Sequence, residues 1–227
     1  MLWRATSLPI AVLGLLGAFG CGTTQPTGTT VLRGMPAPLQ ELRVEAGLVY
    51  ERLVAGDDEV AFTGPARVEE LWREARGRAE RDGAPASAVG VVASAVTALR
   101  WSATGRDDPL AMARAANEVT GATATLVAFY RSGLPPDTLH LDYLQRELAL
   151  DGLAGDLASA AAHARELEAA WLAVRAHVLA AGGRQQTDAF DASVGAVKDA
   201  IVARDLGRLV RIANRGVMLA TSIHGVL

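Results

Sequence analysis

The sequence predicts an all-α protein built from two tandem, internally duplicated units, each resembling a four-helix bundle. Three observations lead to this prediction. Apolar residues recur at alternating three- and four-residue spacings along most of the chain. Alanine is abundant and aromatic residues make up only 5% of the chain, a composition that suits closely packed helices better than strands. The chain also matches itself at a spacing of 99 residues, where Ala55-Gly56-Asp57 recurs as Ala154-Gly155-Asp156.

The three- and four-residue spacing indicates helices that bury one face. In the second unit it runs through Leu153, Leu157, Ala160, Ala164, Leu167, Trp171, Val174 and Val178, and then through Phe190, Val194, Val197 and Ile201. In the first unit it opens with Leu39, Leu42, Ala46, Val49 and Leu53, and closes with Met112, Ala116, Val119, Thr123, Leu126 and Tyr130. We therefore expect four helices in each unit. The uncharged stretch 83–99 is expected to be a buried helix, since its alanines, serines and glycines make a poor membrane span.

The repeat extends over the whole body of the chain. The 99-residue register pairs Trp72 with Trp171, Arg76 with Arg175 and Glu69 with Glu168. At two later loops the spacing shortens by one residue, and the final register pairs Asn117 with Asn214. Between the copies, residues 132–137 combine a glycine, two prolines and an aspartate, which end one helix and start another. We therefore expect a first bundle at 37–132 and a second at 137–227.

Most repeated residues have structural explanations. Gly56 and Gly155 suit left-handed helix ends, and the aspartate that follows each one suits an N-cap. Asp108 and Asp205 are expected to cap later helices in the same way.

The tryptophan–arginine pairs Trp72–Arg76 and Trp171–Arg175 have two interpretations. Each pair spans one helical turn, so the guanidinium can stack on the indole. The alternative is a ligand-binding aromatic–arginine pair in each bundle. The paired asparagines, Asn117 and Asn214, are expected to bridge helices through hydrogen bonds.

The first thirty residues predict export. Arg4 precedes an apolar run at 8–19 that is too short to span a bilayer as a helix. The run ends at Ala18-Phe19-Gly20-Cys21, which resembles the lipobox of bacterial lipoproteins. The resemblance implies that residues 1–20 are a signal peptide and that Cys21 becomes lipidated. Residues 21–36 would then form a polar, flexible tether.

Cys21 is the only cysteine, so an intrachain disulfide is excluded. An incidental cysteine in an ordinary leader or anchor is the alternative to lipidation. We expect an extracytoplasmic protein held at a bacterial membrane, facing the periplasm or the outer surface, with a protein partner as a further possibility. Nucleic acid is not expected as a partner, because the net charge is -3 and arginines alternate with carboxylates along the helices.

A candidate metal site comes from the histidines, all four of which lie in the second unit. His163 and Glu166 are three residues apart and share a helix face. If the chain turns back near Gly155, His140 and Asp142 run past them on the preceding helix. Four nitrogen and oxygen ligands would suit zinc, iron, manganese or copper. The alternative is that both are ordinary polar pairs on helix surfaces.

The spacing of His163 and Glu166 also resembles the His-x-x-Glu motif of the imelysin-like periplasmic iron-uptake proteins, which are helical bundles. The resemblance covers these two residues. It implies a metal-binding role for the second bundle.

Catalytic motifs do not appear in the sequence. There is no glycine-rich phosphate loop, haem-attachment motif or nucleophile elbow. We therefore expect a non-enzymatic helical binding or scaffolding module, with no cofactor favoured. The alternatives are a metal-binding accessory protein and, third, an enzyme with a cleft between the two copies.

Overall fold

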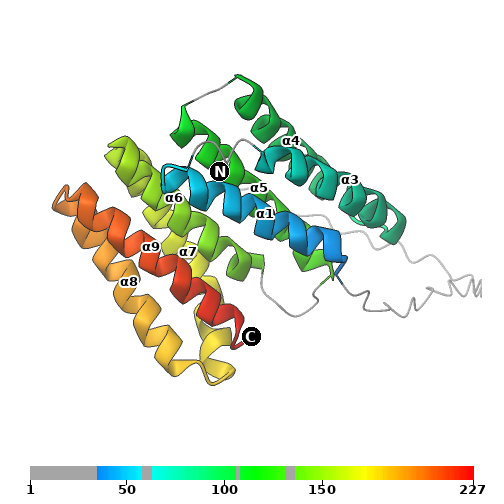
Figure 1. Cartoon of the computed structure of the whole chain (residues 1–227). Coiled ribbons are helices and arrows are strands. Elements are labelled where there is room, and N and C mark those ends of the chain that lie inside the picture. Colours follow the sequence, from blue (N-terminus) through cyan, green and yellow to red (C-terminus); the bar gives the residue numbers. More distant parts are fainter. Residues whose placement is uncertain (1–34, 58–62, 106–107, 131–135) are drawn as a thin grey trace, which may run out of the picture. The chain divides into compact units, whose positions relative to one another are not determined.

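The first predicted unit contains four described helices: α1 (Ala37–Val54), α3 (Gly64–Asp82), α4 (Ala86–Gly105) and α5 (Pro109–Tyr130). The computed structural model (Figure 1) describes residues 35–57, 63–105, 108–130 and 136–227. The predicted signal peptide, Cys21, nearly all of the tether and most of the interdomain segment therefore lie outside the described residues.

The second unit begins with a short 3-10 helix, η1 (Pro136–His140). The helices α6 (Leu141–Ala154), α7 (Leu157–Ala180), α8 (Arg184–Val202) and α9 (Leu206–His224) follow it. No strand occurs in the described ranges, which confirms the all-α prediction there. Residues 32–227 form one compact unit.

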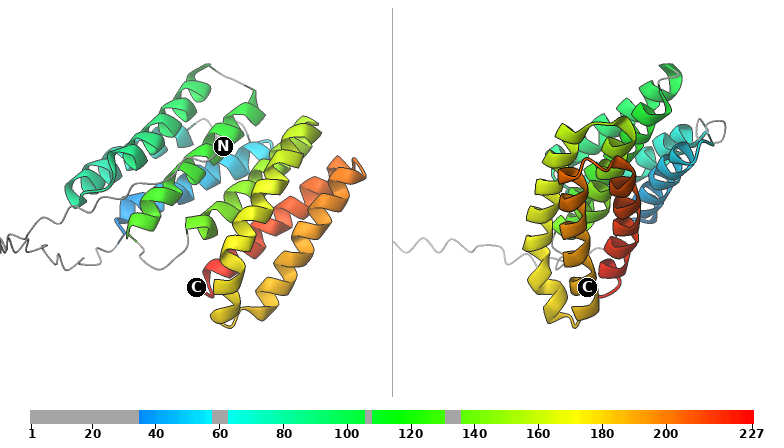
Figure 2. Two further views of the ribbon diagram at one scale, coloured as in Figure 1. Left: turned by 180° about the vertical axis from the view of Figure 1, so that it is seen from behind. Right: turned by 90° about the vertical axis from the view of Figure 1, so that its left-hand side faces the viewer.

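The helices pack in two sets of four (Figure 2). In the first set, α1 and α4 each pack against α3 and α5. In the second, α6 and α8 each pack against α7 and α9. Each set has its own hydrophobic cluster, and α5 packs on α6 where the sets join. The first cluster includes Leu139 and Leu150, which belong to the second unit. The second cluster contains only residues after His140.

The apolar spacing predicted which side chains are buried, with one clear error. Every first-unit position named from the spacing is buried, including Thr123. In the second unit, Leu153 was expected to share a helix face with Leu157, but its side chain is 49% exposed. The reason is that α6 ends at Ala154 and α7 begins at Leu157, so the two leucines lie on different helices.

The helix ends follow the predicted pattern. Gly56 and Gly155 adopt left-handed conformations, with φ of 79° and 76°. The carboxylate of Asp156 accepts hydrogen bonds from the backbone N–H groups of the first turn of α7, and Asp205 accepts one from Arg208 at the start of α9. The residues that Asp57 would cap lie outside the described ranges.

Helix α4 covers most of the stretch that was expected to be buried. Of the described helices, it is the one whose length and composition would allow a membrane crossing. In the structure it packs against α3 and α5 and buries Ala88, Val89, Val92, Val96, Leu99 and Ser102.

Candidate functional site

Helix α6 differs from its neighbours because it buries charge. Eleven of its 14 residues are buried. All four charged residues that are buried in the described part of the chain lie on this one helix: Asp142, Arg146, Glu147 and Asp151. Burying a charge is costly unless a partner compensates it, so the partners of these side chains define the site.

One group of contacts joins α6 to α5 and α7. The guanidinium of Arg114 on α5 bonds Glu147 and also donates to Asp151 Oδ1 at 3.0 Å. Asn117 Nδ2 donates to Glu147 Oε1 at 2.8 Å and to the backbone carbonyl of Tyr143 at 3.0 Å. From α7, His163 Nδ1 donates to Asp151 Oδ2 at 2.6 Å. We call Arg114, Asn117, Glu147, Asp151 and His163 the α6 ion cluster.

The protonation states in the α6 ion cluster follow from burial and hydrogen bonding. Burial raises the pKa of Glu147, while the hydrogen bond from Asn117 and the charge of Arg114 lower it. The hydrogen bond to Asp151 raises the pKa of His163, and burial opposes that shift. The guanidinium of Arg114, and His163 when protonated, offset the negative charge of the two carboxylates.

The predicted metal ligands do not converge. Among the described residues, the one group of three potential ligands is Glu147, Asp151 and His163, whose donor atoms lie within 4.8 Å of one another. Of the predicted set, only His163 belongs to it.

The other three predicted ligands have different surroundings. Asp142 faces Arg43 of the first bundle, with its Oδ2 3.7 Å from Arg43 Nη2. The ring of His140 lies 5.0 Å from that of Tyr143, and Glu166 is exposed. The prediction failed because it assumed that Asp142 faces α7, whereas this side of α6 faces α1. The acids at 147 and 151, one turn apart among the leucines and alanines of the second half of the helix, were the overlooked sequence signal.

The tryptophan–arginine pairs also differ from the prediction. Trp171 Nε1 donates to Asp191 Oδ1 at 2.7 Å, and the guanidinium of Arg175 bonds both oxygens of the same carboxylate. These bonds, that from Arg175 first, lower the pKa of Asp191. The two side chains therefore share Asp191, and the described contacts include no stacking of Arg175 on the indole.

In the first copy this arrangement is absent. Arg76 Nε donates instead to Glu80 at 2.8 Å, one turn along the same helix. The register that aligns Val96 with Val194 places Ala93 opposite Asp191, so no equivalent carboxylate exists there. The predicted bridge by Asn117 is confirmed, but Asn214 is exposed and makes no such bridge among the described contacts.

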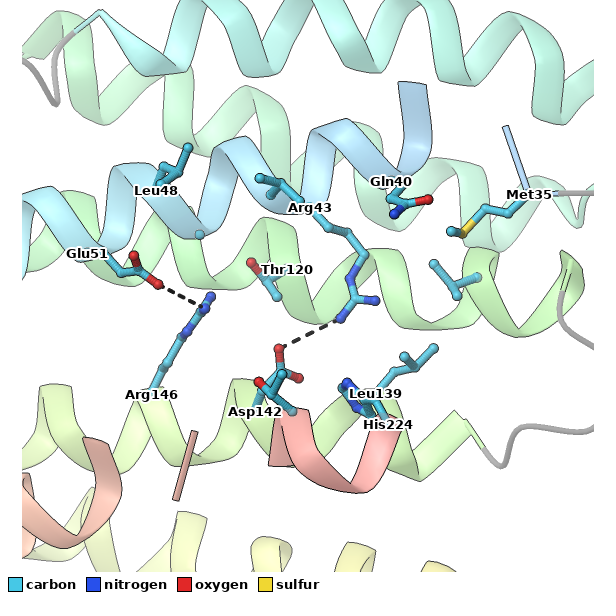
Figure 3. Close-up of a pocket in the computed structure, with 14 residues that line it drawn as sticks. Met35, Gln40, Arg43, Leu48, Glu51, Thr120, Leu139, Asp142, Arg146 and His224 are labelled. Carbon is cyan, nitrogen blue, oxygen red and sulfur yellow. Dashed lines mark ion pairs between the residues drawn. The ribbon is translucent and has the colours of Figure 1, made fainter. Parts of the chain in front are cut away.

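A cavity of about 490 Å³ lies between the two bundles (Figure 3). Residues of α1, α5, α6 and α9 line it, together with Met35 and Leu139. Two long ion pairs cross it: Arg43 with Asp142, and Arg146 Nη2 with Glu51 Oε1, each at 3.7 Å. Both distances exceed hydrogen-bond range, so the pairs are electrostatic contacts without direct hydrogen bonds.

Repeat-equivalent residues face each other across this cavity. Four pairs of lining residues are equivalent in the duplication: Gln40 with Leu139, Arg43 with Asp142, Gly47 with Arg146, and Val127 with His224. The cavity is therefore lined in part by equivalent positions of the two copies.

Arg146 is the least satisfied charge in the cavity. It is only 8% exposed, and its guanidinium lies 5.1 Å from the ring centre of Tyr50. It also lies so close to Gly47 that an added Cβ would be 3.3 Å from its nitrogens, which explains the glycine. Within the described part of the chain, its Nε and Nη1 have no hydrogen-bond partner. Burial raises the pKa of Tyr50 to about 12, so that phenol stays neutral and cannot serve as a counterion.

Comparison of the chain with protein-family models, with curated proteins and with solved structures found no match. The candidate site is therefore argued from its own geometry. Sequence reasoning missed Arg146 because an arginine on a helix is usually solvated, whereas here its side chain lies against Gly47 and Tyr50 of α1.

Proposed function

We propose that this chain is a lipid-anchored, extracytoplasmic binding protein, without enzymatic activity, whose ligand site is the cavity between the two bundles. In this proposal, lipid on Cys21 holds the protein at a bacterial membrane and residues 22–36 form the tether. The observation that carries the proposal is a buried guanidinium, that of Arg146, with two unsatisfied donor atoms beside a cavity of about 490 Å³. This volume falls within the range of about 300–1,000 Å³ that is typical of small-molecule sites.

The duplication supports the same proposal. A ligand in this cavity touches both copies, so neither copy alone forms the complete site. The copies have also diverged at the cavity, where Gly47 stands opposite Arg146 and Arg43 stands opposite Asp142. The site is therefore asymmetric although the fold is repeated. An asymmetric site suits a ligand whose two ends differ chemically.

A fluorescent probe tests binding at the cavity. We expect 8-anilinonaphthalene-1-sulfonate, which has an anionic group on an aromatic body, to brighten on adding residues 32–227. Val44 lines the cavity and is 58% exposed, so Val44→Trp should fill the entrance without unfolding the protein. The matched control is Val91→Trp on α4, at a site that is 56% exposed and away from this cavity. Equal probe binding by both variants and by the wild type would contradict the proposed site.

The anchor is tested separately in cells. Cys21→Ala should abolish labelling with a fatty-acid probe and release the protein from the membrane fraction, because stable retention requires multiple acyl chains on this residue. Unchanged labelling and retention would show that Cys21 is not the anchor.

Metal binding is a second candidate function, because Glu147, Asp151 and His163 bring three potential ligands together. The competing cation is Arg114, which already bonds both carboxylates. A true site would raise the melting temperature with Zn²⁺, Fe²⁺, Mn²⁺ or Cu²⁺ relative to chelator, and His163→Ala would remove that rise. Identical melts in metal and chelator would exclude this function.

A further inference from the structure

Resting on the proposed function, we propose that the cavity binds an amphiphilic carboxylate, with the oxyanion at Arg146 and an aliphatic body along the apolar wall. Neither the lipid anchor nor the helical fold implies this ligand class. It follows from the charges and apolar surfaces that line the cavity.

The buried charges around the cavity do not balance. Arg43 and Arg146 are cations with side chains only 18% and 10% exposed, whereas Asp142, at 12%, is the one comparably buried anion lining the cavity. Glu51 faces Arg146, but its side chain is 62% exposed and its charge is screened by water. His224 adds no negative charge, since its Nε2 donates to the carbonyl of Thr138 at 2.9 Å. Among the described residues that line the cavity, buried cations therefore outnumber buried anions by one.

Arg146 is the cavity-lining cation with the most buried side chain. Its guanidinium lies against the ring of Tyr50 and close to the backbone at Gly47. A guanidinium attracts a carboxylate by its charge and its N–H donors, and among the described residues the buried Nε and Nη1 of Arg146 have no hydrogen-bond partner. Figure 3 shows the side chain extending from α6 across the cavity toward α1.

Part of the remaining wall is apolar. Met35, Val44, Leu48, Val127 and Leu139 line the cavity. Val44 and Leu48 are 58% and 37% exposed, so they form an uncovered apolar rim. An aliphatic chain that starts at Arg146 would cover this rim and remove it from water, which is favourable in proportion to the area buried. A single excess charge suits a monocarboxylate better than a phosphate monoester, which carries close to two negative charges at neutral pH.

Calorimetric titration of residues 32–227 with octanoate tests this inference. The uncharged and cationic comparisons are 1-octanol and octylamine, and octyl phosphate tests the alternative oxyanion. We expect octanoate to bind most tightly of the four. Arg146→Met should weaken octanoate binding about tenfold to a hundredfold, the usual loss for a hydrogen bond to a charged group, and should leave octanol binding unchanged. Arg146→Lys should retain part of the affinity because it keeps the charge.

The matched control is Arg100→Met on α4, an arginine paired at 3.3 Å with the exposed Glu69 outside this cavity. It should bind octanoate as the wild type does. Equal binding of octanoate and octanol, with no effect of Arg146→Met, would overturn the carboxylate inference and leave cavity binding standing. Tighter binding of octylamine or octyl phosphate would also overturn it. If no probe binds to any variant, both this inference and the proposed cavity function fail.

Discussion

Helices α1 and α6 occupy equivalent places in the duplication, with Leu42 of one aligned with Leu141 of the other. Yet they bury very different surfaces. The buried residues of α1 are apolar or small, apart from the hydroxyl of Tyr50. Those of α6 include Asp142, Gln145, Arg146, Glu147 and Asp151. In the 99-residue register, Leu48 and Arg52 of α1 stand where α6 has Glu147 and Asp151.

The difference shows how a duplicated helix adapts to a second set of neighbours. Helix α6 packs on α7 and α9 within its own bundle and on α5 of the other. Its outward face, which would be solvated in a single bundle, is therefore covered. That face has kept polar side chains, and partners from α1, α5 and α7 compensate most of their charge. Each core is thus apolar, and the two sets of helices are also linked by an ionic joint, in which Arg43 and Arg114 pair with Asp142, Glu147 and Asp151 of α6.

The largest effect is expected when the two copies are expressed as separate fragments, because this tests whether each core is stable without the other. Residues 136–227 should fold alone with a cooperative thermal melt, because their hydrophobic cluster contains no residue of the first copy. Residues 32–130 should be less stable, since their cluster loses Leu139 and Leu150. Circular dichroism and thermal melts of both fragments provide the measurement. A disordered second fragment would mean that the bundles depend on each other for folding.

Emptying the two equivalent tryptophan sites should have the next largest effect. Trp171→Ala should lower the free energy of unfolding by about 3–5 kcal/mol, the usual cost of truncating a large core side chain. Trp72→Ala should cost about 1 kcal/mol less, because Trp72 has no counterpart of the hydrogen bond to Asp191. Urea denaturation of both variants measures the difference. Equal costs would show that the shared carboxylate adds nothing.

The ionic joint can be tested with repeat-equivalent arginines. Arg114→Met should cost about 2–3 kcal/mol, because it leaves the buried Glu147 without its cation and Asp151 with His163 as its remaining partner. This is less than for a fully buried pair, since the Arg114 side chain is 35% exposed. The control is Arg211→Met at the equivalent exposed position on α9, which should change stability by about 0.5 kcal/mol or less. A small effect at Arg114 would refute the ionic joint.

The smallest expected effect is a pH dependence of the folding stability that His163 contributes. The equivalent residue of the first copy is Gly64, which has no ionisable side chain. The pKa of His163 is raised in the folded protein by its bond to Asp151, so protonation stabilises the fold. This stabilisation is fully present below the unfolded pKa of about 6.5 and is lost as pH rises through the higher folded pKa. The stability difference between wild type and His163→Gln should therefore shrink from pH 6 to pH 9. A constant difference would show that His163 does not titrate with folding.

Several features could be predicted from particular residues alone. The apolar spacing from Leu39 to Leu53 and from Met112 to Tyr130 identified buried helix faces, because one face of a periodic helix must leave water whatever it packs against. Gly155 and Asp156 identified a helix end and the next cap, because both depend on local backbone chemistry. Asn117 was correctly placed between helices.

The sequence by itself thus determined the helices, their buried faces, most of their caps and the duplication, since these depend on contacts within a few turns of chain or on direct self-comparison. The tertiary structure alone decided which polar residues meet. Asp142 turned toward Arg43 rather than His163, and Glu147 and Asp151 took the place of the predicted ligands. Arg146 became buried where its guanidinium meets Gly47 and Tyr50 of α1. Such pairings depend on the relative orientation of helices that are distant in sequence. The spacing of residues within one helix carries no information about that orientation.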